Sequence, residues 1–193
     1  MLKELIVKNR SYRRFYQQER IDYRTLKELV DLARLSPSSA NLQPLKYILS
    51  WKEERNALIF PCLKWAGYLK DWDGPEEGER PAGYIIILGD REISQSFAYD
   101  CGICAQTILL GAVEKGWGGC IIGSIERDAL RRALDIPSRY EILLVLALGK
   151  PKEEVRLVES KGEIRYWRDE KGVHYVPKRG LEEIILNISQ FIS

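Results

Sequence analysis

Two arginines near the amino terminus have the type and spacing of a phosphate clamp. Arg10 and Arg13 flank the hydroxyl of Ser11 within four residues. Guanidinium groups bind phosphate oxygens through paired hydrogen bonds, and a hydroxyl between them can add another. The alternative is a solvated surface, because 30 of the 193 residues are Lys or Arg. Taken alone, the segment favours that alternative, so other motifs must support a binding site.

A second polar segment lies between two prolines. Its short side chains offer the donors and acceptors that the edge of a heterocyclic ring requires. The same residue types are common in an ordinary turn from helix to strand, which is the alternative. We interpret the segment as a rigid loop that presents polar groups. It consists of Pro37, Ser38, Ser39, Ala40, Asn41, Leu42, Gln43 and Pro44.

The glycine-rich stretch 116–123 fits neither of the common nucleotide-binding loops. It lacks the Gly-Lys-Ser/Thr of a P-loop and the spacing G-x-G-x-x-G. The backbone around Gly119, Cys120 and Ile121 could approach a flat ligand, or it could be a packing turn. A basic pair, Lys178 and Arg179, precedes the last predicted helix, where anions are favoured, although a solvated pair is the alternative.

Side chains that could attack a substrate directly are scarce. His174 is the only histidine, so neither a Ser-His-Asp set nor a histidine-rich metal site can be assembled, and we expect no metal. Cys101 and Cys104 form a CxxC motif within an apolar helix, which favours packing over a redox dithiol. These absences point to a cofactor that carries out the chemistry.

The elements that must position these motifs alternate between helices and strands, which predicts an α+β domain spanning residues 1–193. Asp22 is a candidate N-cap, and the run 84–88 is apolar throughout, as in a strand buried on both faces. Residues 150–180 are highly charged, and we expect an extended arm with a hairpin near Lys171 and Gly172. The predicted helices span 22–35, 97–115, 127–134 and 181–192, and the predicted strands 46–51, 84–88, 120–122 and 141–148.

Composition narrows the class of protein further. The net charge of +2 and the pI near 8.3 fall short of a strongly basic nucleic-acid binder. The first ten residues do not resemble a signal peptide, and no run approaches the roughly 20 apolar residues of a membrane span. Four cysteines without the spacing of a small secreted domain agree with a cytoplasmic protein. We therefore expect no nucleic-acid or membrane partner.

In this order, the motifs resemble those of the nitroreductase-like flavoprotein family over almost the whole chain. Residues 10–13 are similar to its RSxR motif, and residues 37–44 to its PSxxNxQP loop. The helix 100–114 followed by residues 116–123 resembles its long core helix and G-x-G-x-C-x-x-G turn. Leu148-Gly149-Lys150-Pro151 with the basic segment after it resembles its G-x-P turn and closing arm.

The resemblance implies a homodimer with FMN at the interface, a central mixed, mostly antiparallel sheet flanked by helices, and a C-terminal arm that reaches the partner subunit. Hydride would pass from NADH or NADPH to FMN and then, in a ping-pong sequence, to a small flat acceptor such as a nitroaromatic or a quinone. No catalytic side chain is implied, and backbone near Gly119, Cys120 and Ile121 would approach the reactive edge of the ring. The implied cofactor-binding residues are Arg10, Ser11, Arg13, Pro37, Ser38, Ser39, Asn41, Gln43, Gly119, Ile121, Lys178 and Arg179.

The chain departs from the family pattern at two positions. Asn9 stands where many members carry a basic residue, and Gly119 where a hydroxyl residue is common. Trp65, Tyr68 and Trp72 in the stretch 60–75 are expected to form an outer pocket wall that favours flat acceptors. A flavin-binding carrier or sensor without turnover is the alternative function, and a basic nucleic-acid-binding module is a third.

Overall fold

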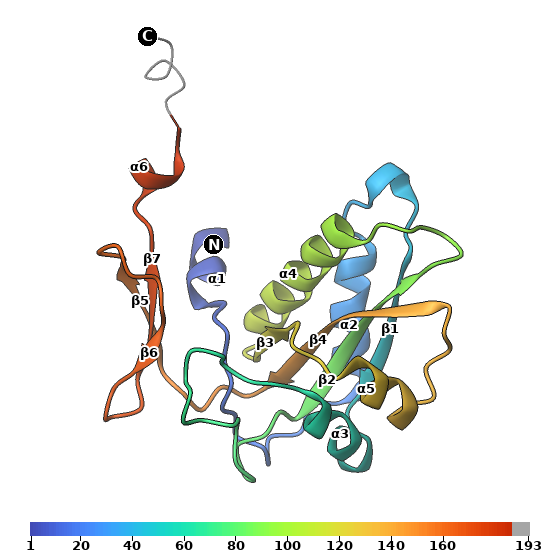
Figure 1. Ribbon diagram of the computed structural model, residues 1–193, viewed down its shortest axis with the longest axis horizontal. Coiled ribbons are helices and arrows are strands. Elements are labelled where there is room, and N and C mark those ends of the chain that lie inside the picture. The colour runs from blue at the N-terminus through green and yellow to red at the C-terminus, as the bar shows by residue number, and fades with distance from the viewer. Residues whose placement is uncertain (187–193) are drawn as a thin grey trace.

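The computed structural model describes residues 1–186, and its centre is a four-stranded sheet (Figure 1). The strands are β1 (Leu45–Ser50), β2 (Gly83–Asp90), β3 (Gly118–Ile122) and β4 (Tyr140–Gly149). They lie in the order β1-β2-β4-β3, and each neighbouring pair is antiparallel. The four predicted strands are confirmed. The expected mixture of directions is not found among the described strands of this sheet, where no parallel pair occurs.

Strand β2 is the centre of two hydrophobic cores. All eight of its residues are buried, as the continuous apolar run predicted. Because successive side chains of a strand point to opposite faces, Ile85 and Ile87 belong to one core, and Tyr84, Ile86 and Leu88 to the other. The sheet therefore requires helices on both faces.

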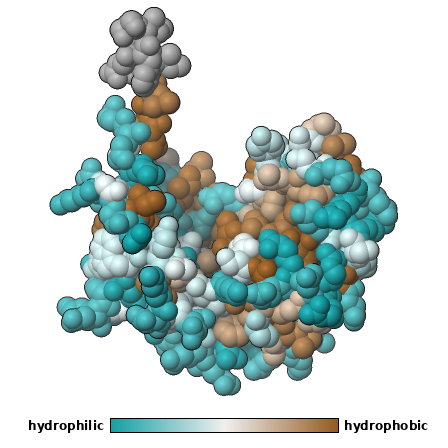
Figure 2. Space-filling model, in the orientation of Figure 1, coloured by the Kyte–Doolittle hydropathy of each residue, from teal (hydrophilic) through white to brown (hydrophobic). Residues whose placement is uncertain are grey.

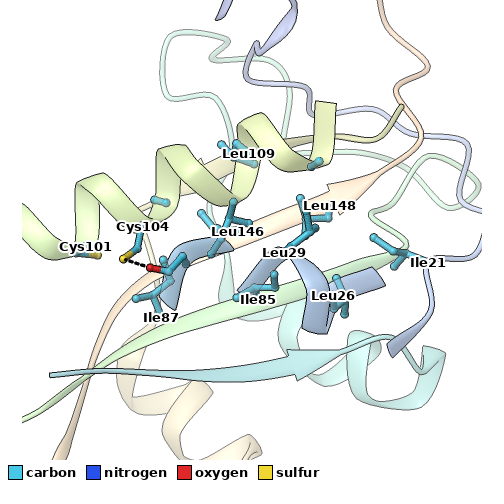
Figure 3. Close-up of a cluster of buried hydrophobic side chains, with 14 of the residues drawn as sticks. Ile21, Leu26, Leu29, Ile85, Ile87, Cys101, Cys104, Leu109, Leu146 and Leu148 are labelled. Atoms are coloured by element: carbon cyan, nitrogen blue, oxygen red, sulfur yellow. Dashed lines mark hydrogen bonds between the residues drawn. The ribbon is translucent and has the colours of Figure 1, made fainter. Parts of the chain in front are cut away.

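Helices α2 (Tyr23–Arg34) and α4 (Ala98–Glu114) cover the first face (Figure 3). Asp22 caps α2, since its carboxylate accepts a hydrogen bond of 2.7 Å from the backbone N–H of Thr25. Leu26 and Leu29 of α2 pack into the core against the strands and α4. Both helices agree with their predicted spans to within one residue at each end.

The second face is covered by α3 (Glu53–Ile59), the 3-10 turn η2 (Phe60–Cys62) and α5 (Arg127–Ala133). Ile59, Cys62 and Leu130 pack there against the strands. The short helix α3 was not predicted, whereas α5 was. Among the described residues, no helix has the length and apolar character that a membrane crossing requires.

The arm forms a second, smaller sheet beside the amino-terminal helix α1 (Leu2–Lys8) (Figure 1). Its strands are β5 (Val155–Glu159), β6 (Trp167–Arg168) and β7 (His174–Lys178). Strand β7 pairs antiparallel with β6, which confirms the hairpin, and parallel with β5, which was not predicted. The turn between β6 and β7 includes Gly172, whose φ of +81° suits glycine.

The last described helix, α6 (Leu181–Ile184), is shorter than predicted. Ile185 already has an extended backbone, so the expected helix 181–192 is wrong at this position. Leu181 and Ile184 are exposed, and without burial of an apolar face so short a helix has little to prolong it. The rest of that prediction, residues 187–193, lies outside the described residues.

Candidate functional site

The amino-terminal segment, β3 and the arm enclose a cavity of about 250 Å³. We call it the basic cavity. Five of the residues predicted to bind a cofactor line it: Arg10, Ser11, Arg13, Ile121 and Lys178. Residues from both ends of the chain thus meet at one place. Among the described residues that line the cavity, three are cationic and none is a carboxylate.

Backbone pairing holds the segment 11–15 in position. Ser11 forms a parallel bridge with Gly119, and the N–H of Tyr12 donates to the Gly119 carbonyl at 3.0 Å. Phe15, which is fully buried, forms an antiparallel bridge with Pro151 at the start of the arm. Gly119 therefore contacts the clamp segment through its backbone, and it is not among the residues that line the basic cavity.

The glycine at position 119 is explained by packing. A Cβ there would lie 2.7 Å from the Ala147 carbonyl oxygen and 2.7 Å from Cδ2 of Leu109. Both distances are shorter than a carbon contact tolerates, so a side chain would push β3 away from its neighbours. This departure from the family pattern has a local structural reason.

Arg10 supplies the test of whether an anion fits the cavity. Its Nη2 donates to the Ile6 carbonyl at 2.7 Å, but its Nε is buried and has no hydrogen-bond partner among the described residues. Burial lowers the pKa of Arg10 from its ordinary value, yet an arginine stays protonated in proteins. A buried donor of a charged group is costly unless an acceptor binds it. The residues present therefore suit the phosphate of FMN.

His174 also lines the basic cavity and was not predicted to do so. It is 1% exposed, and its ring centroid lies 5.1 Å from that of Tyr166. Burial lowers its pKa to about 4, with Arg13 and Arg168 adding to the effect, so the ring is neutral at pH 7. A signal existed, because residues 174, 176 and 178 alternate along a strand, which puts His174 on the same face as Lys178.

Glu153 connects the clamp segment to the arm and was likewise missed. Its buried carboxylate accepts hydrogen bonds from the backbone N–H of Arg13 and, at 2.9 Å, from Nη2 of Arg168. The Arg13 guanidinium lies 5.0 Å from the Tyr166 ring centroid. The hydrogen bond from Arg13 to Glu153 joins the clamp segment to the arm, the pair Glu153–Arg168 lies within the arm, and no sequence motif marks either.

The loop between the two prolines is held by Asp100, in the first turn of α4. Its carboxylate accepts from the hydroxyl of Ser38 and, at 3.0 Å, from the backbone N–H of Ser39. The Ser38 hydroxyl in turn accepts from the Gln43 N–H at 2.9 Å. Ala40, Asn41 and Gln43 have φ values of 48°, 55° and 51°. Such left-handed backbone is costly for residues with a side chain and is found where a fixed loop shape matters.

This loop does not line the basic cavity. Pro37, Ser38 and Gln43 border a separate cavity of about 160 Å³, whereas Ser39 and Asn41 are exposed. Cys104 lines this smaller cavity and Gln106 lines the basic one. At about 100° per residue, these two positions lie on nearly opposite sides of α4. One protomer alone therefore does not bring the clamp and the polar loop into a single cavity.

Two further predictions lie outside the basic cavity. Arg179 does not line it and forms an ion pair of 3.2 Å with Glu183 instead. Of the three aromatic residues expected in an outer wall, Trp65 is buried in the second core. Tyr68 packs against Tyr166, with ring centroids 4.9 Å apart, and the Trp72 ring lies 4.8 Å from the Arg168 guanidinium. These two residues contact the arm.

The cysteines are buried and free. Cys104 donates to the Ala33 carbonyl at 3.6 Å (dashed in Figure 3), and burial raises the pKa of Cys101 to about 11. A thiol that stays protonated at neutral pH is a poor nucleophile, which agrees with packing. Within the described part of the chain, no three His, Cys, Asp or Glu side chains are grouped as a metal site would need.

Comparison with known proteins identifies the fold and the family. The sequence model of the nitroreductase family matches residues 6–150. A Bacillus subtilis protein provisionally named NAD(P)H nitroreductase, MhqN, is 23% identical, over 79% of this chain and 89% of that protein.

Solved structures agree. An FMN-dependent nitroreductase from Clostridium difficile superposes with a TM-score of 0.63 at 24% identity, over 78% of this chain and 87% of that one. A nitroreductase family protein from Clostridium novyi reaches 0.66 at 22% identity, over 96% and 99% of the two chains. The α+β fold is thus that of nitroreductase structures, and the chain belongs to the nitroreductase family.

Proposed function

We propose that the chain is an FMN-dependent NAD(P)H oxidoreductase that acts as a homodimer and that residues 1–193 form one domain. The observation that carries the proposal is the basic cavity, in which Arg10 has a buried donor without a partner. Family membership supports it. The name of the Clostridium difficile structure, an FMN-dependent nitroreductase, supports the choice of cofactor.

In this proposal, the clamp binds the phosphate. Arg10 and Arg13 supply guanidinium donors, Ser11 a hydroxyl and Lys178 an ammonium group. Ile121, half exposed at the cavity, and the backbone of β3 would contact the apolar part of the cofactor. Arg179 would remain paired with Glu183 at the rim.

The polar loop would come from the other subunit. Because Ser38 and the clamp border separate cavities on different sides of α4, a second chain must supply one of the two to any shared site. Pro37, Ser38, Ser39, Asn41 and Gln43 would then line the ring system of the FMN bound to the partner. Asp100 keeps these residues in a fixed conformation before the cofactor binds.

When bound, FMN would take a hydride from NADH or NADPH and transfer reducing equivalents to a small flat acceptor such as a nitroaromatic or a quinone. The protein's own part is to bind and orient. The cations of the basic cavity would anchor the phosphate, and the positive charge would favour the reduced, anionic form of the cofactor. His174 is buried and neutral, so this proposal gives it no role as a general acid.

The deciding experiment is an absorption spectrum of the purified protein, before and after anaerobic addition of NADH or NADPH. We expect a flavin spectrum, or one restored by added FMN, that bleaches rapidly with a nicotinamide. Protein that stays colourless after incubation with FMN would eliminate the proposal.

A flavin-binding carrier or sensor without turnover is the second candidate. Asn9 favours it, because an amide brings no positive charge to the phosphate and one of its two N–H donors is already used by the Gln106 side chain, at 3.2 Å. Under this alternative the protein binds FMN, but neither nicotinamide bleaches it. The same anaerobic experiment therefore separates the two functions.

A further inference from the structure

His174 lines the basic cavity with a buried ring, and one of its two ring nitrogens has no hydrogen-bond partner among the described residues. It begins β7, and Val176 and Lys178 follow it on the same face of that strand. Its Nδ1 is buried and has no hydrogen-bond partner among the described residues. An unpaired buried nitrogen is unfavourable, so the position calls for a ligand or another reason to be polar.

The neighbouring arginine determines which ring nitrogen carries the proton. Nη1 of Arg13 lies 3.5 Å from Nε2 of His174. Arginine has donors and no acceptor, so a hydrogen bond in this contact requires Nε2 to accept. In a neutral imidazole the other nitrogen then holds the proton. Nδ1 is therefore an N–H donor that no described group accepts.

The chemistry around that donor selects its acceptor. The cavity contains Arg10, Arg13 and Lys178 and, among its described lining residues, no carboxylate. A group with several oxygen acceptors and negative charge suits such a site, and a phosphate monoester has both. Nε of Arg10 is a second unused donor at the same cavity.

We propose that His174 is a further cofactor-binding residue, which donates its Nδ1–H to the phosphate of FMN. This inference rests on the proposed function and adds an uncharged donor from the arm to the cationic clamp. A neutral ring suits the position, because a fourth cation beside Arg13 and Arg168 would be repelled. Glu153 supports the arrangement, since it binds both the Arg13 backbone and the Arg168 side chain.

The test uses the fact that the chain has a single histidine. In tag-free, uniformly ¹⁵N-labelled full-length protein, long-range ¹H–¹⁵N spectra contain the ring signals of His174 alone. We expect a neutral ring protonated on Nδ1. Addition of FMN should shift the Nδ1 resonances, whereas riboflavin, which lacks the phosphate, should leave them in place while its quenched fluorescence confirms binding.

Variants give a second, independent measurement by FMN fluorescence titration. His174→Leu should weaken FMN binding about 10- to 100-fold, the effect of losing a hydrogen bond to a charged group, and leave riboflavin affinity unchanged. His174→Asn, which restores an N–H donor, should recover part of the loss. Tyr175→Phe is the matched control, because Tyr175 lies on the same strand as His174 and its hydroxyl donates to Asp169, at 3.1 Å, outside the cavity; its loss should change neither affinity.

The outcomes distinguish the two proposals. A wild-type protein that binds no FMN overturns both. If FMN binds but the Nδ1 signal stays in place, or riboflavin shifts it equally, the role of His174 is wrong and the proposed function stands. Equal loss of FMN and riboflavin affinity in His174→Leu would show a purely structural role and would also overturn the inference.

Discussion

At the scale of single residues, Arg13 has separable backbone and side-chain roles. Its backbone N–H donates to Glu153, whereas its guanidinium faces the basic cavity. Arg13→Ala keeps the backbone contact and removes the guanidinium. We expect at least about tenfold weaker FMN binding, since a charged hydrogen-bonding group is lost, with a small change in melting temperature. Fluorescence titration and thermal denaturation measure the two effects.

Arg20→Ala is the control for this substitution. Arg20 is exposed and pairs with Glu53 at 2.9 Å, away from the basic cavity. Its loss should leave FMN affinity unchanged. If Arg13→Ala retained wild-type affinity as well, the clamp assignment would be wrong.

Substitution of Gly119 tests the packing explanation for this glycine rather than cofactor binding. Gly119→Ala would place a Cβ 2.7 Å from the Ala147 carbonyl oxygen, and we expect the free energy of unfolding to fall by about 1–3 kcal/mol. Gly123→Ala is the comparison, because its Cβ would meet only Leu144 Cδ2, at 3.7 Å. Urea denaturation of both variants measures the difference. An equal effect at the two positions would contradict the packing explanation.

At the scale of elements, Asp100 connects α4 to the polar loop. Asp100→Ala removes the acceptor for Ser38 and Ser39 and leaves three left-handed residues without that support. We expect a loss of about 1–3 kcal/mol in stability, and faster hydrogen exchange across residues 38–43. Asp128→Ala, in the first turn of α5, is the control, for which exchange in the loop should be unchanged.

Glu79 connects the amino-terminal segment to the arm. The Arg14 side chain, followed by Lys152, holds the pKa of Glu79 down to about 2, against an ordinary value of 4.5. A carboxyl whose pKa is lower in the folded than in the unfolded state stabilises the protein at pH values above its unfolded pKa. This contribution disappears as the pH falls from about 4.5 towards 2. It should amount to about 1–2 kcal/mol after allowance for solvent screening.

Denaturant unfolding at pH 7, 4 and 3 measures this effect. Stability should fall less steeply with decreasing pH in Glu79→Gln than in the wild type, and the two should converge at the acid end. Glu170→Gln, exposed on the arm, is the control and should follow the wild type. Parallel curves for Glu79→Gln and the wild type would refute the prediction.

Elements with a strong periodic pattern could be predicted from sequence, and short ones could not. Leu26, Leu29 and the cap Asp22 defined α2, and an apolar run defined β2. In contrast, α3 has seven residues and begins with charged ones, and β5 is a half-exposed strand in a charged segment. Neither presents a clear period, because tertiary contacts rather than a continuous apolar face stabilise them.

The site divides in the same way. Motifs whose residue types indicate anion binding could be read from the sequence. Four of their residues line the basic cavity: Arg10, Ser11, Arg13 and Lys178. His174, Glu153 and Asp100 act through partners far away in the sequence. Their contacts depend on how the arm and the loop fold back, which local spacing does not encode; for His174, the alternation along the strand indicates only that it shares a face with Lys178.

At the scale of the whole molecule, exposed apolar side chains agree with association of two chains. Figure 2 shows a hollowed face between the arm and the central sheet with hydrophobic residues along it. On α4, Tyr99 is 79% and Ile103 41% exposed. We expect sedimentation to give about twice the 22.3 kDa of one chain, with one FMN per chain.

A substitution on the exposed side of α4 gives the sharper test. Ile103→Asp should dissociate the dimer and abolish tight FMN binding, although every clamp residue is intact, because a buried charge without a partner is costly at an interface. Leu58→Asp, exposed on α3 at the opposite face of the sheet, should affect neither. A monomer that binds FMN with full affinity would disprove the shared site.

The residues that line the basic cavity extend along the sequence from Asn9 to Lys178. On the ribosome, the clamp arginines leave the exit tunnel well before the arm that closes their cavity, because the arm follows all four strands of the central sheet in the sequence. A chain truncated within the arm would keep all four strands of the central sheet and lack part of the cavity wall. Under the proposed function, uptake of the cofactor would thus distinguish chains that contain the arm from chains that stop before it.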